Sequence, residues 1–440
     1  MEVQTLNREE ILKSFIKHKD MVEKRNAEGI EKYRKGDFTI KFKNANKKKV
    51  IVKQKNHKFL FGTTGFMLGC FEDAKKEEIY KEKFAQLFNQ AVVPFYWKDL
   101  EPEEGKLRFR KDSEYIYRRP APDTVLEFCS EYGIEPKGHC LVWNSHIPKW
   151  LSKYTPEERK AIVERRIKQI AQEYADKIPS WDIVNESASF YIAGKTDLFD
   201  CYDEIGMQLG AKYFPNNIKI LNDTNNAIWE RYCYHGKYMP FNMQIKEFLQ
   251  KGITIDELGL QFHMFLTADQ IGQDKAQREY LDIKNMIEIL DIYNAYNLPM
   301  HISEITVPSF FVKNETNENI QAEIVETYYK TWFATKNMKS IVWWNLVDGY
   351  AAYAPLGSCE GENRYGGGLL RFDMTEKPAY KVLDRLINHE WKTSLETEID
   401  SDTLSFRGFY GEYEITIVDE NGVYCVTQKL LNNGDCIELK

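Results

Sequence analysis

The chain has 440 residues, of which 43% are hydrophobic and 14% aromatic, so it can bury a large core and is expected to form one large domain with smaller attachments. Its net charge of -7 and its lack of long basic tails argue against a nucleic-acid partner. Residues 1–19 lack the apolar core of a signal peptide, and no run of about 18 apolar residues that would span a membrane occurs. A cytoplasmic protein with no membrane partner is therefore the simplest expectation.

Residues 1–57 are predicted to form an extension made of a helix and a β-hairpin. Ile11, Phe15 and His18 have the spacing of one face of an amphipathic helix. Residues 38–43 and 50–53 alternate apolar and polar side chains on either side of a polar turn, which is typical of two paired strands. The lysines between them then belong to a solvated hairpin edge rather than to a phosphate-binding patch.

From residue 58 to residue 391, short β-rich runs alternate with segments of helical period. The clearest helical segments are 156–177, 241–251, 277–297 and 320–336. The predicted strands are 59–62, 91–96, 136–143, 181–185, 218–221, 258–263, 300–304 and 340–346. Eight strands alternating with helices favour a closed α/β barrel of the (β/α)8 TIM type over an open doubly wound sheet.

Residues 392–440 change to short alternating runs at 403–406, 413–418, 423–430 and 436–439. This pattern predicts a small β-rich C-terminal appendage packed on the barrel. Such an appendage either has a structural role or binds sugar, and the sequence leaves both readings open.

The eight cysteines are scattered without short paired spacing, so free buried thiols are expected rather than disulfides or a zinc site. No group of His, Cys, Asp and Glu has the spacing of metal ligands. We therefore expect no metal and no other cofactor. The oligomeric state is left open.

Two predicted strands end in a glutamate, Glu186 after residues 181–185 and Glu304 after residues 301–303. The strand ends of such a barrel meet at one face, where two carboxylates can act on one glycosidic bond. One carboxyl group must be protonated and the other ionised. Asn185 can bind a sugar hydroxyl while Glu186 reaches the glycosidic oxygen, so Glu186 is predicted to be the acid/base and Glu304 the nucleophile.

Polar residues near the ends of other strands support this interpretation. Gln261 and His263 share one face of the sixth strand, and His263 is expected to hydrogen-bond Glu304 and keep it ionised. His139 lies in an apolar run and is either a hydrogen-bonded core histidine or a substrate contact. A single strand-end glutamate could equally form a salt bridge, but two glutamates in register with Asn, Gln and His favour catalysis.

The chain resembles the family 10 glycoside hydrolases, a xylanase family with a (β/α)8 barrel and a retaining mechanism, over about residues 57–391. The matching motifs are residues 138–143, 181–186, 221–223, 259–263, 302–304, 344–348, 369–373 and 377–380. The resemblance implies cleavage of β-1,4-linked xylan-type oligosaccharides through a covalent glycosyl-enzyme intermediate. It also implies an oligosaccharide as the binding partner, with Trp143, Trp344, Tyr96 and Asn144 among the substrate-binding residues.

The chain departs from the family pattern after the second and third strands. The family's Glu-Asn pair and following Lys, counted back from residues 101–105, correspond to Val92, Val93 and Tyr96. A histidine that the family places beside Trp143 is Asn144 here.

Three explanations of the second-strand change stay open. The alignment is displaced by a residue or two, Lys98 replaces the missing lysine, or the pocket is more apolar with Tyr96 and Trp97 as walls. The last case suits a substituted or branched oligosaccharide or a small β-glucoside, because lost hydrogen-bond donors change the sugar that binds best. A carbohydrate-binding protein without turnover is a third class, and the presence of both glutamates disfavours it.

Overall fold

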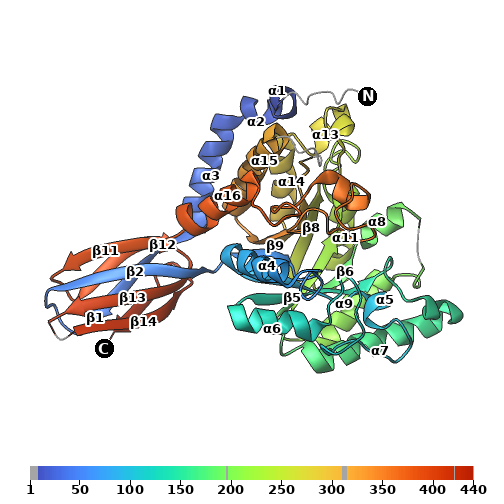
Figure 1. Ribbon diagram of the computed structural model, residues 1–440, viewed down its shortest axis with the longest axis horizontal. Helices are drawn as coiled ribbons and strands as arrows, with labels where there is room; N and C mark the ends of the chain where they lie inside the picture. The colour runs from blue at the N-terminus through green and yellow to red at the C-terminus, as the bar shows by residue number, and fades with distance from the viewer. Residues whose placement is uncertain (1–7, 195–196, 310–314, 421, 440) are drawn as a thin grey trace.

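The computed structural model describes residues 8–194, 197–309, 315–420 and 422–439. Eight parallel strands close into a barrel in the order β10-β3-β4-β5-β6-β7-β8-β9, which confirms the predicted (β/α)8 architecture (Figure 1). The barrel strands are β3 (Leu60–Thr64), β4 (Gln90–Pro94), β5 (Glu135–Trp143), β6 (Ser180–Asn185), β7 (Ile218–Asp223), β8 (Glu257–His263), β9 (Met300–Thr306) and β10 (Met338–Trp343).

Helices connect the barrel strands, and a further group precedes the barrel. The N-terminal helices are α1 (Arg8–Ile11), α2 (Lys13–Lys17) and α3 (Lys19–Tyr33). The remaining helices are α4 (Ala74–Leu87), α5 (Trp97–Leu100), α6 (Pro122–Tyr132), α7 (Pro156–Tyr174), α8 (Ser187–Ile192), α9 (Tyr202–Tyr213), α10 (Asn225–Ile228), α11 (Pro240–Gln250), α12 (Ala268–Ile271), α13 (Asp274–Glu279), α14 (Ile283–Asn294), α15 (Glu315–Ala334), α16 (Pro378–Asp384), the 3-10 turns η1 (Lys149–Lys153) and η2 (Gly361–Tyr365), and the π-helical segment η3 (Arg385–Glu390). None of these helices combines the length and apolarity needed to cross a membrane.

The predicted single helix over residues 277–297 is wrong, because two helices, α13 and α14, occupy this part of the chain. The side chain of Asp282 accepts a hydrogen bond from the Lys284 backbone N–H at 3.0 Å and so starts α14 as its N-cap. Helical periodicity continues across the break, which is why the pattern alone did not reveal it.

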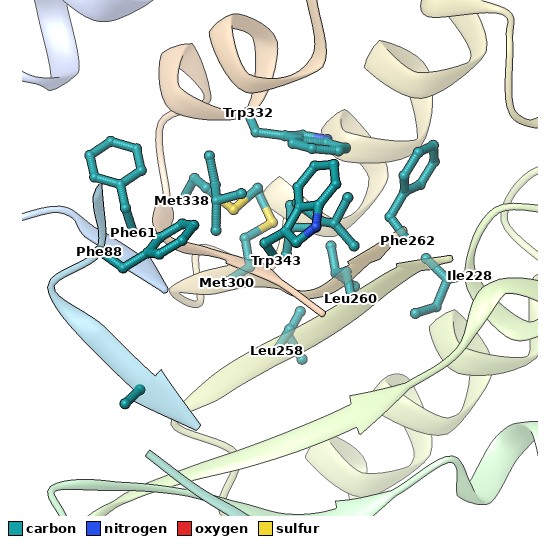
Figure 2. Close-up of a cluster of buried hydrophobic side chains, with 14 of the residues drawn as sticks. Phe61, Phe88, Ile228, Leu258, Leu260, Phe262, Met300, Trp332, Met338 and Trp343 are labelled. Carbon is teal, nitrogen blue, oxygen red and sulfur yellow. The ribbon is translucent and has the colours of Figure 1, made fainter. Parts of the chain in front are cut away.

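Aromatic and aliphatic side chains fill the layer between the barrel and its outer helices. Figure 2 shows Trp343 of β10 and Phe262 of β8 lying close to Trp332 of α15. The rings of Phe262 and Trp332 are 5.3 Å apart and nearly perpendicular. Phe262 and Trp343 lie at the carboxyl ends of β8 and β10, so this packing holds the strand ends that carry the neighbouring polar side chains.

The remaining strands form two sheets that pack face to face beside the barrel (Figure 1). One sheet has the order β12-β1-β15 and the other the order β11-β2-β13-β14. Their strands are β1 (Lys35–Phe42), β2 (Lys48–His57), β11 (Ser394–Ile399), β12 (Thr403–Phe409), β13 (Gly411–Asp419), β14 (Gly422–Leu430) and β15 (Cys436–Leu439).

The predicted hairpin of β1 and β2 is wrong, because the two strands lie in different sheets. Phe38 and Ile40 of β1 and Val50 and Val52 of β2 belong to one buried cluster, so their apolar faces meet across the sandwich. Each strand pairs instead with strands from the C-terminal end of the chain. The N-terminal extension and the C-terminal appendage therefore share one sandwich.

All eight cysteines are free, as predicted, but only Cys70, Cys129 and Cys140 are buried. The other five are exposed, so the expectation of buried thiols was wrong for most of them. Cys425 and Cys436 lie in the edge strands β14 and β15, where alternate residues face solvent, and Cys201, Cys233 and Cys359 lie outside the strands.

Candidate active site

Glu186 directly follows β6, and Glu304 lies near the end of β9, so both belong to the face formed by the carboxyl ends of the barrel strands. The backbone N–H of Glu186 donates to the Asn222 carbonyl at 2.8 Å. Glu186 has a φ of 56°, in a left-handed region that non-glycine residues seldom adopt and that recurs at functional sites. The chain turns there from β6 into α8 and presents the Glu186 side chain at the barrel mouth.

Two side chains donate hydrogen bonds to the carboxyl group of Glu186. The indole N–H of Trp143 lies 3.1 Å from Oε2, and Nε2 of Gln261 lies 3.1 Å from Oε1. Both oxygens are therefore oriented before any substrate binds.

Glu304 is 4% exposed and is surrounded by nitrogen atoms. Its Oε2 lies 3.0 Å from Nε2 of His263, and its Oε1 accepts a hydrogen bond of 3.3 Å from Nδ2 of Asn222. Nε2 of His139 lies 3.8 Å from the same Oε1. His263 is thus next to Glu304, where the sequence analysis placed it.

A network of side-chain amides connects the two glutamates. Oδ1 of Asn185 accepts from Nδ2 of Asn222 at 2.7 Å and from Nε2 of Gln261 at 3.2 Å. Gln261 also contacts Glu186, and Asn222 also contacts Glu304. Nδ2 of Asn185 has no hydrogen-bond partner among the described residues, so it is free to donate to a ligand.

Asn222 belongs to one of the family motifs, residues 221–223, but was not predicted to be a site residue. It lies in β7 one residue before the strand ends, and its Oδ1 also accepts from Ser303 at 2.6 Å. Asn222 lies at the carboxyl end of a barrel strand, as Glu186 and Glu304 do, so its position in the sequence could have indicated a site residue.

Burial dominates the electrostatics of the pair. It raises the pKa of Glu186 to about 8, and the negative charge of Glu304 adds to this effect. Burial also raises the pKa of Glu304 to about 7, against the lowering effects of His139, Lys137 and the Asn222 hydrogen bond. Glu304 therefore loses its proton before Glu186 does.

The activity of this pair is expected to have a bell-shaped pH profile. Below the pKa of Glu304, near 7, the nucleophile is protonated, and above the pKa of Glu186, near 8, the acid is ionised. We expect kcat/KM to rise through the first value and to fall through the second. Glu186→Gln should lose the alkaline limb and keep the acid limb, measured on an aryl glycoside on which wild type shows both limbs. An alkaline limb that persists in this variant would contradict the assignment.

His139 and Lys137 form a buried ion-pair group below Glu304. Nδ1 of His139 and Nζ of Lys137 both lie 2.7 Å from Oδ2 of Asp182. Burial alone would raise the pKa of Asp182, but Lys137 and His139 together lower it. Asp182 is buried in the barrel wall, and it orients His139 toward Glu304.

Thr306 is a second residue that the sequence analysis missed, and it holds His263. Its hydroxyl lies 3.0 Å from Nδ1 of His263. Burial lowers the pKa of His263 to about 4, so the ring is neutral and carries one proton. With the hydroxyl donating to Nδ1, the proton sits on Nε2 and is donated to Glu304.

Thr306→Val should lower kcat/KM by about 2- to 13-fold, the effect of losing a hydrogen bond of ~0.5–1.5 kcal/mol. The acid limb of the pH profile should move to higher pH, because Glu304 then receives a poorer donor. Thr306→Ser should keep the wild-type profile. Thr335→Val, which removes another buried hydroxyl bonded at 2.9 Å to the Thr331 carbonyl, is the control. An unchanged acid limb in Thr306→Val would leave Thr306 with a packing role alone.

Aromatic rings border the carboxylates. Trp344 follows β10, and its ring lies 5.8 Å from that of His139 and 5.6 Å from that of His263. Trp143 stacks on His146 with ring centroids 4.1 Å apart. Tyr96 is 3% exposed, and its ring lies 5.3 Å from that of Trp143. These faces suit the apolar faces of sugar rings.

The residues that differ from the family pattern at the second barrel strand do not form one pocket. Val92 and Tyr96 share a small buried cluster beside Trp143 and Trp344, whereas Val93 and Trp97 belong to the main core. The Arg119 guanidinium lies 4.2 Å from the Tyr96 ring centroid. Tyr96 is thus buried beside Trp143 and Trp344, whereas Trp97 lies in the main core.

Lys98 and Asn144 have other partners. Nζ of Lys98 donates to the hydroxyl of Tyr353 at 2.6 Å, and Tyr353 is 74% exposed, so Lys98 lies at the rim. Oδ1 of Asn144 accepts from the backbone N–H groups of Asp197 and Leu198 at 2.9 and 3.0 Å. Asn144 is buried, and these two hydrogen bonds hold the loop.

Within the described part of the chain, no group of three or more His, Cys, Asp or Glu residues is arranged to hold a metal ion. The contacts of His139 and His263 are to carboxylates and a hydroxyl. The arrangement is that of two buried carboxyl groups, each oriented by hydrogen-bonding side chains.

Comparison with known proteins gives a family match over most of the chain. The sequence model of glycosyl hydrolase family 10 matches residues 51–384. Endo-1,4-beta-xylanase 2 of Arabidopsis thaliana is 24% identical over 371 residues, which are 81% of this chain and 30% of that protein. Anti-sigma-I factor RsgI6 of Acetivibrio thermocellus is 26% identical over 398 residues, 86% of this chain and 44% of that protein. The chain thus spans less than half the length of these curated relatives.

Solved structures share the fold. Xylanase 10B from Thermotoga petrophila RKU-1 in complex with xylobiose superposes with a TM-score of 0.56 and 21% identity. That alignment covers 76% of this chain and 95% of the other.

Proposed function

The chain belongs to glycosyl hydrolase family 10, and from this premise we propose that it is a retaining glycoside hydrolase that cleaves β-1,4-linked xylan-type oligosaccharides. The observation that carries the proposal is the pair of buried glutamates, Glu186 and Glu304, joined by side-chain amides at the catalytic face of the barrel. A protein that only binds sugar needs no such pair with separated pKa values.

In the first step, the ionised Glu304 attacks the anomeric carbon while Glu186 protonates the departing glycosidic oxygen. The C–O bond to the leaving sugar breaks as the ester bond to Glu304 forms. In the second step, Glu186, now ionised, takes a proton from water, and the resulting hydroxide equivalent displaces Glu304. Each step inverts the anomeric carbon, so the configuration is retained overall.

Other residues bind and orient the sugar in this proposal. Nδ2 of Asn185, which lacks a partner among the described residues, donates to a hydroxyl of the ring at the cleavage point. Gln261 and His263 orient the two carboxylates, and His139, Trp143, Trp344 and Tyr96 form the walls. The xylanase name of the Arabidopsis thaliana relative and the xylobiose complex of the Thermotoga petrophila enzyme support the substrate class.

A second candidate activity is the same chemistry on a substituted or branched oligosaccharide or on a small β-glucoside. Its support is the presence of Val92 and Tyr96, two buried side chains beside Trp143 and Trp344, at positions where hydrogen-bonding residues would grip the hydroxyls of an unsubstituted chain. An apolar wall disfavours a sugar whose hydroxyls would be left without partners there.

The pattern of products from xylohexaose separates the two activities. We expect internal cleavage to xylobiose and xylotriose, with Glu304→Ala as the blank, because the glutamate pair needs only a β-xylosidic bond at the cleavage point. No cleavage by folded protein, together with release of nitrophenol from an aryl β-glucoside, would contradict the xylan-type substrate and support the second candidate.

A further inference from the structure

A cavity of about 280 Å³ lies where the barrel meets the sandwich. Phe59, just before β3, and Lys339 in β10 line it, so it is at the amino ends of the barrel strands, opposite to Glu186 and Glu304. Phe409, Tyr410 and the loop before β15 line its other side. In Figure 1 this is the junction between the barrel and the sheets of β1 and β2.

The charged residues that line the cavity are all cations: Arg34, Lys58, Lys336 and Lys339. The chain as a whole has 67 acidic and 60 basic residues, so a lining with four cations and no acidic residue differs from the overall composition. Lys58, Lys336 and Arg34 donate hydrogen bonds to neutral oxygens, and the charge of Lys339 acts on the carboxyl group of Glu257. Lys58 donates to the Leu431 carbonyl at 2.8 Å, and Lys336 donates to Asn297 at 3.2 Å. Arg34 donates to the carbonyls of Phe333 and Thr335.

Lys58 and Lys339 repel each other across this space. Burial lowers the pKa of Lys58, and the positive charge of Lys339 lowers it further, while Asp435 acts weakly in the opposite direction. The Asp435 carboxylate accepts hydrogen bonds from the backbone N–H groups of Leu431 and Asn432 at 2.6 and 2.8 Å, so it is engaged by its own loop. An anion between the two lysines would remove the repulsion.

Flat apolar faces complete the cavity. The Lys58 ammonium lies 5.6 Å from the ring centroid of Tyr410, and the Arg34 guanidinium lies 5.0 Å from that of Phe59. Phe409 adds a third ring. Cations beside aromatic rings form a pocket that can hold an anionic group at one side and a ring at the other. The volume fits a ligand of about monosaccharide size.

We propose that this cavity binds a small organic anion, a molecule of about monosaccharide size that carries a phosphate or carboxylate group. The anionic group lies between Lys58 and Lys339, and the ring lies against Phe409 and Tyr410. Asn433 has its Oδ1 engaged by the Asp37 backbone N–H at 2.9 Å, which leaves its amide hydrogens free for the ligand. This site is separate from the glutamate pair and does not depend on the proposed hydrolase activity.

Isothermal titration calorimetry of the full chain with glucose 6-phosphate, glucuronate, inorganic phosphate and glucose tests the proposal. We expect saturable binding of at least one of the two sugar anions, weaker binding of inorganic phosphate, and no binding of glucose. A preference for glucose 6-phosphate identifies the phosphate, and one for glucuronate identifies the carboxylate. Absence of binding by both sugar anions, or equal binding of glucose, would overturn the proposal.

Matched variants assign the binding to this cavity. K58Q/K339Q should weaken binding of the preferred anion about tenfold or more, because both charge-assisted contacts are lost. K13Q/K24Q, which removes two exposed lysines of α2 and α3, should bind within about twofold of wild type. K58R/K339R should keep most of the affinity, and the melting temperatures of all variants report folding. Wild-type affinity in folded K58Q/K339Q would refute the site.

Discussion

Glu304→Ala is expected to lower kcat/KM by about 10⁵-fold, or ~7 kcal/mol of transition-state stabilisation, on every substrate tested. Without the carboxylate no glycosyl ester forms, and no neighbouring group replaces it, since His263 and Asn222 only donate hydrogen bonds to this position. The loss should be similar for good and poor leaving groups, because every substrate must form the same ester with Glu304 as its leaving group departs. Initial rates on aryl xylobiosides and on xylohexaose measure the effect.

The same variant should melt at or above the wild-type temperature. Burial raises the pKa of Glu304 to about 7, so the folded state disfavours its charge, and removing the carboxyl group relieves that cost above the unfolded pKa. Glu257→Ala is the matched control. Glu257 begins β8 at the opposite end of the barrel, and burial likewise raises its pKa to about 7. Full activity in Glu257→Ala and none in Glu304→Ala would show that the loss comes from the missing nucleophile and not from removal of a buried carboxyl group. Appreciable turnover by folded Glu304→Ala would contradict the assignment of Glu304 as the nucleophile.

Glu186→Ala should produce a loss that depends on the leaving group. With an unactivated oligosaccharide, the departing oxygen needs a proton, and we expect a loss of about 10⁴-fold. With a dinitrophenyl glycoside, which leaves without protonation, formation of the ester should be nearly unimpaired and its hydrolysis should become limiting. Steady-state rates over a series of aryl xylobiosides, together with the burst of released phenol, measure both steps.

Azide provides a second test of Glu186. A small anion that needs no general base can occupy the space left by the carboxylate and displace Glu304 from the sugar, so azide should raise the turnover of Glu186→Ala and yield a β-glycosyl azide. Azide should not stimulate wild type or Glu257→Ala. An equal loss on activated and unactivated substrates would argue against Glu186 as the acid.

The barrel and its two glutamates could be predicted because the local sequence carries the information. A buried strand of a parallel sheet is a short apolar run, and the residue at its carboxyl end is where the barrel places its catalytic groups. Glu186, Glu304, Gln261 and His263 were found by this argument, and the structure brings all four together. Asn222 and Thr306 follow the same rule but were not selected, because an amide or a hydroxyl at a strand end is less distinctive than a carboxylate.

The sandwich could not be predicted in the same way. Alternation over residues 38–43 and 50–53 shows that each strand has one buried face, but it does not say which strand lies beside it. Val50 pairs with Thr397 on one side and with Ile417 on the other, both far along the chain. Local patterns therefore revealed the strands, and the pairing depended on contacts between the two ends of the chain.

Trapping the covalent intermediate tests the central claim most directly. A 2-deoxy-2-fluoro-β-xylobioside with a dinitrophenyl leaving group slows both steps through the electron-withdrawing fluorine, but its leaving group keeps the first step faster than the second. The account predicts that the mass of the intact protein rises by one fluoroxylobiosyl group and that peptide mapping places this group on Glu304. A label on Glu186, or turnover of the same compound to the inverted sugar without a label, would contradict it.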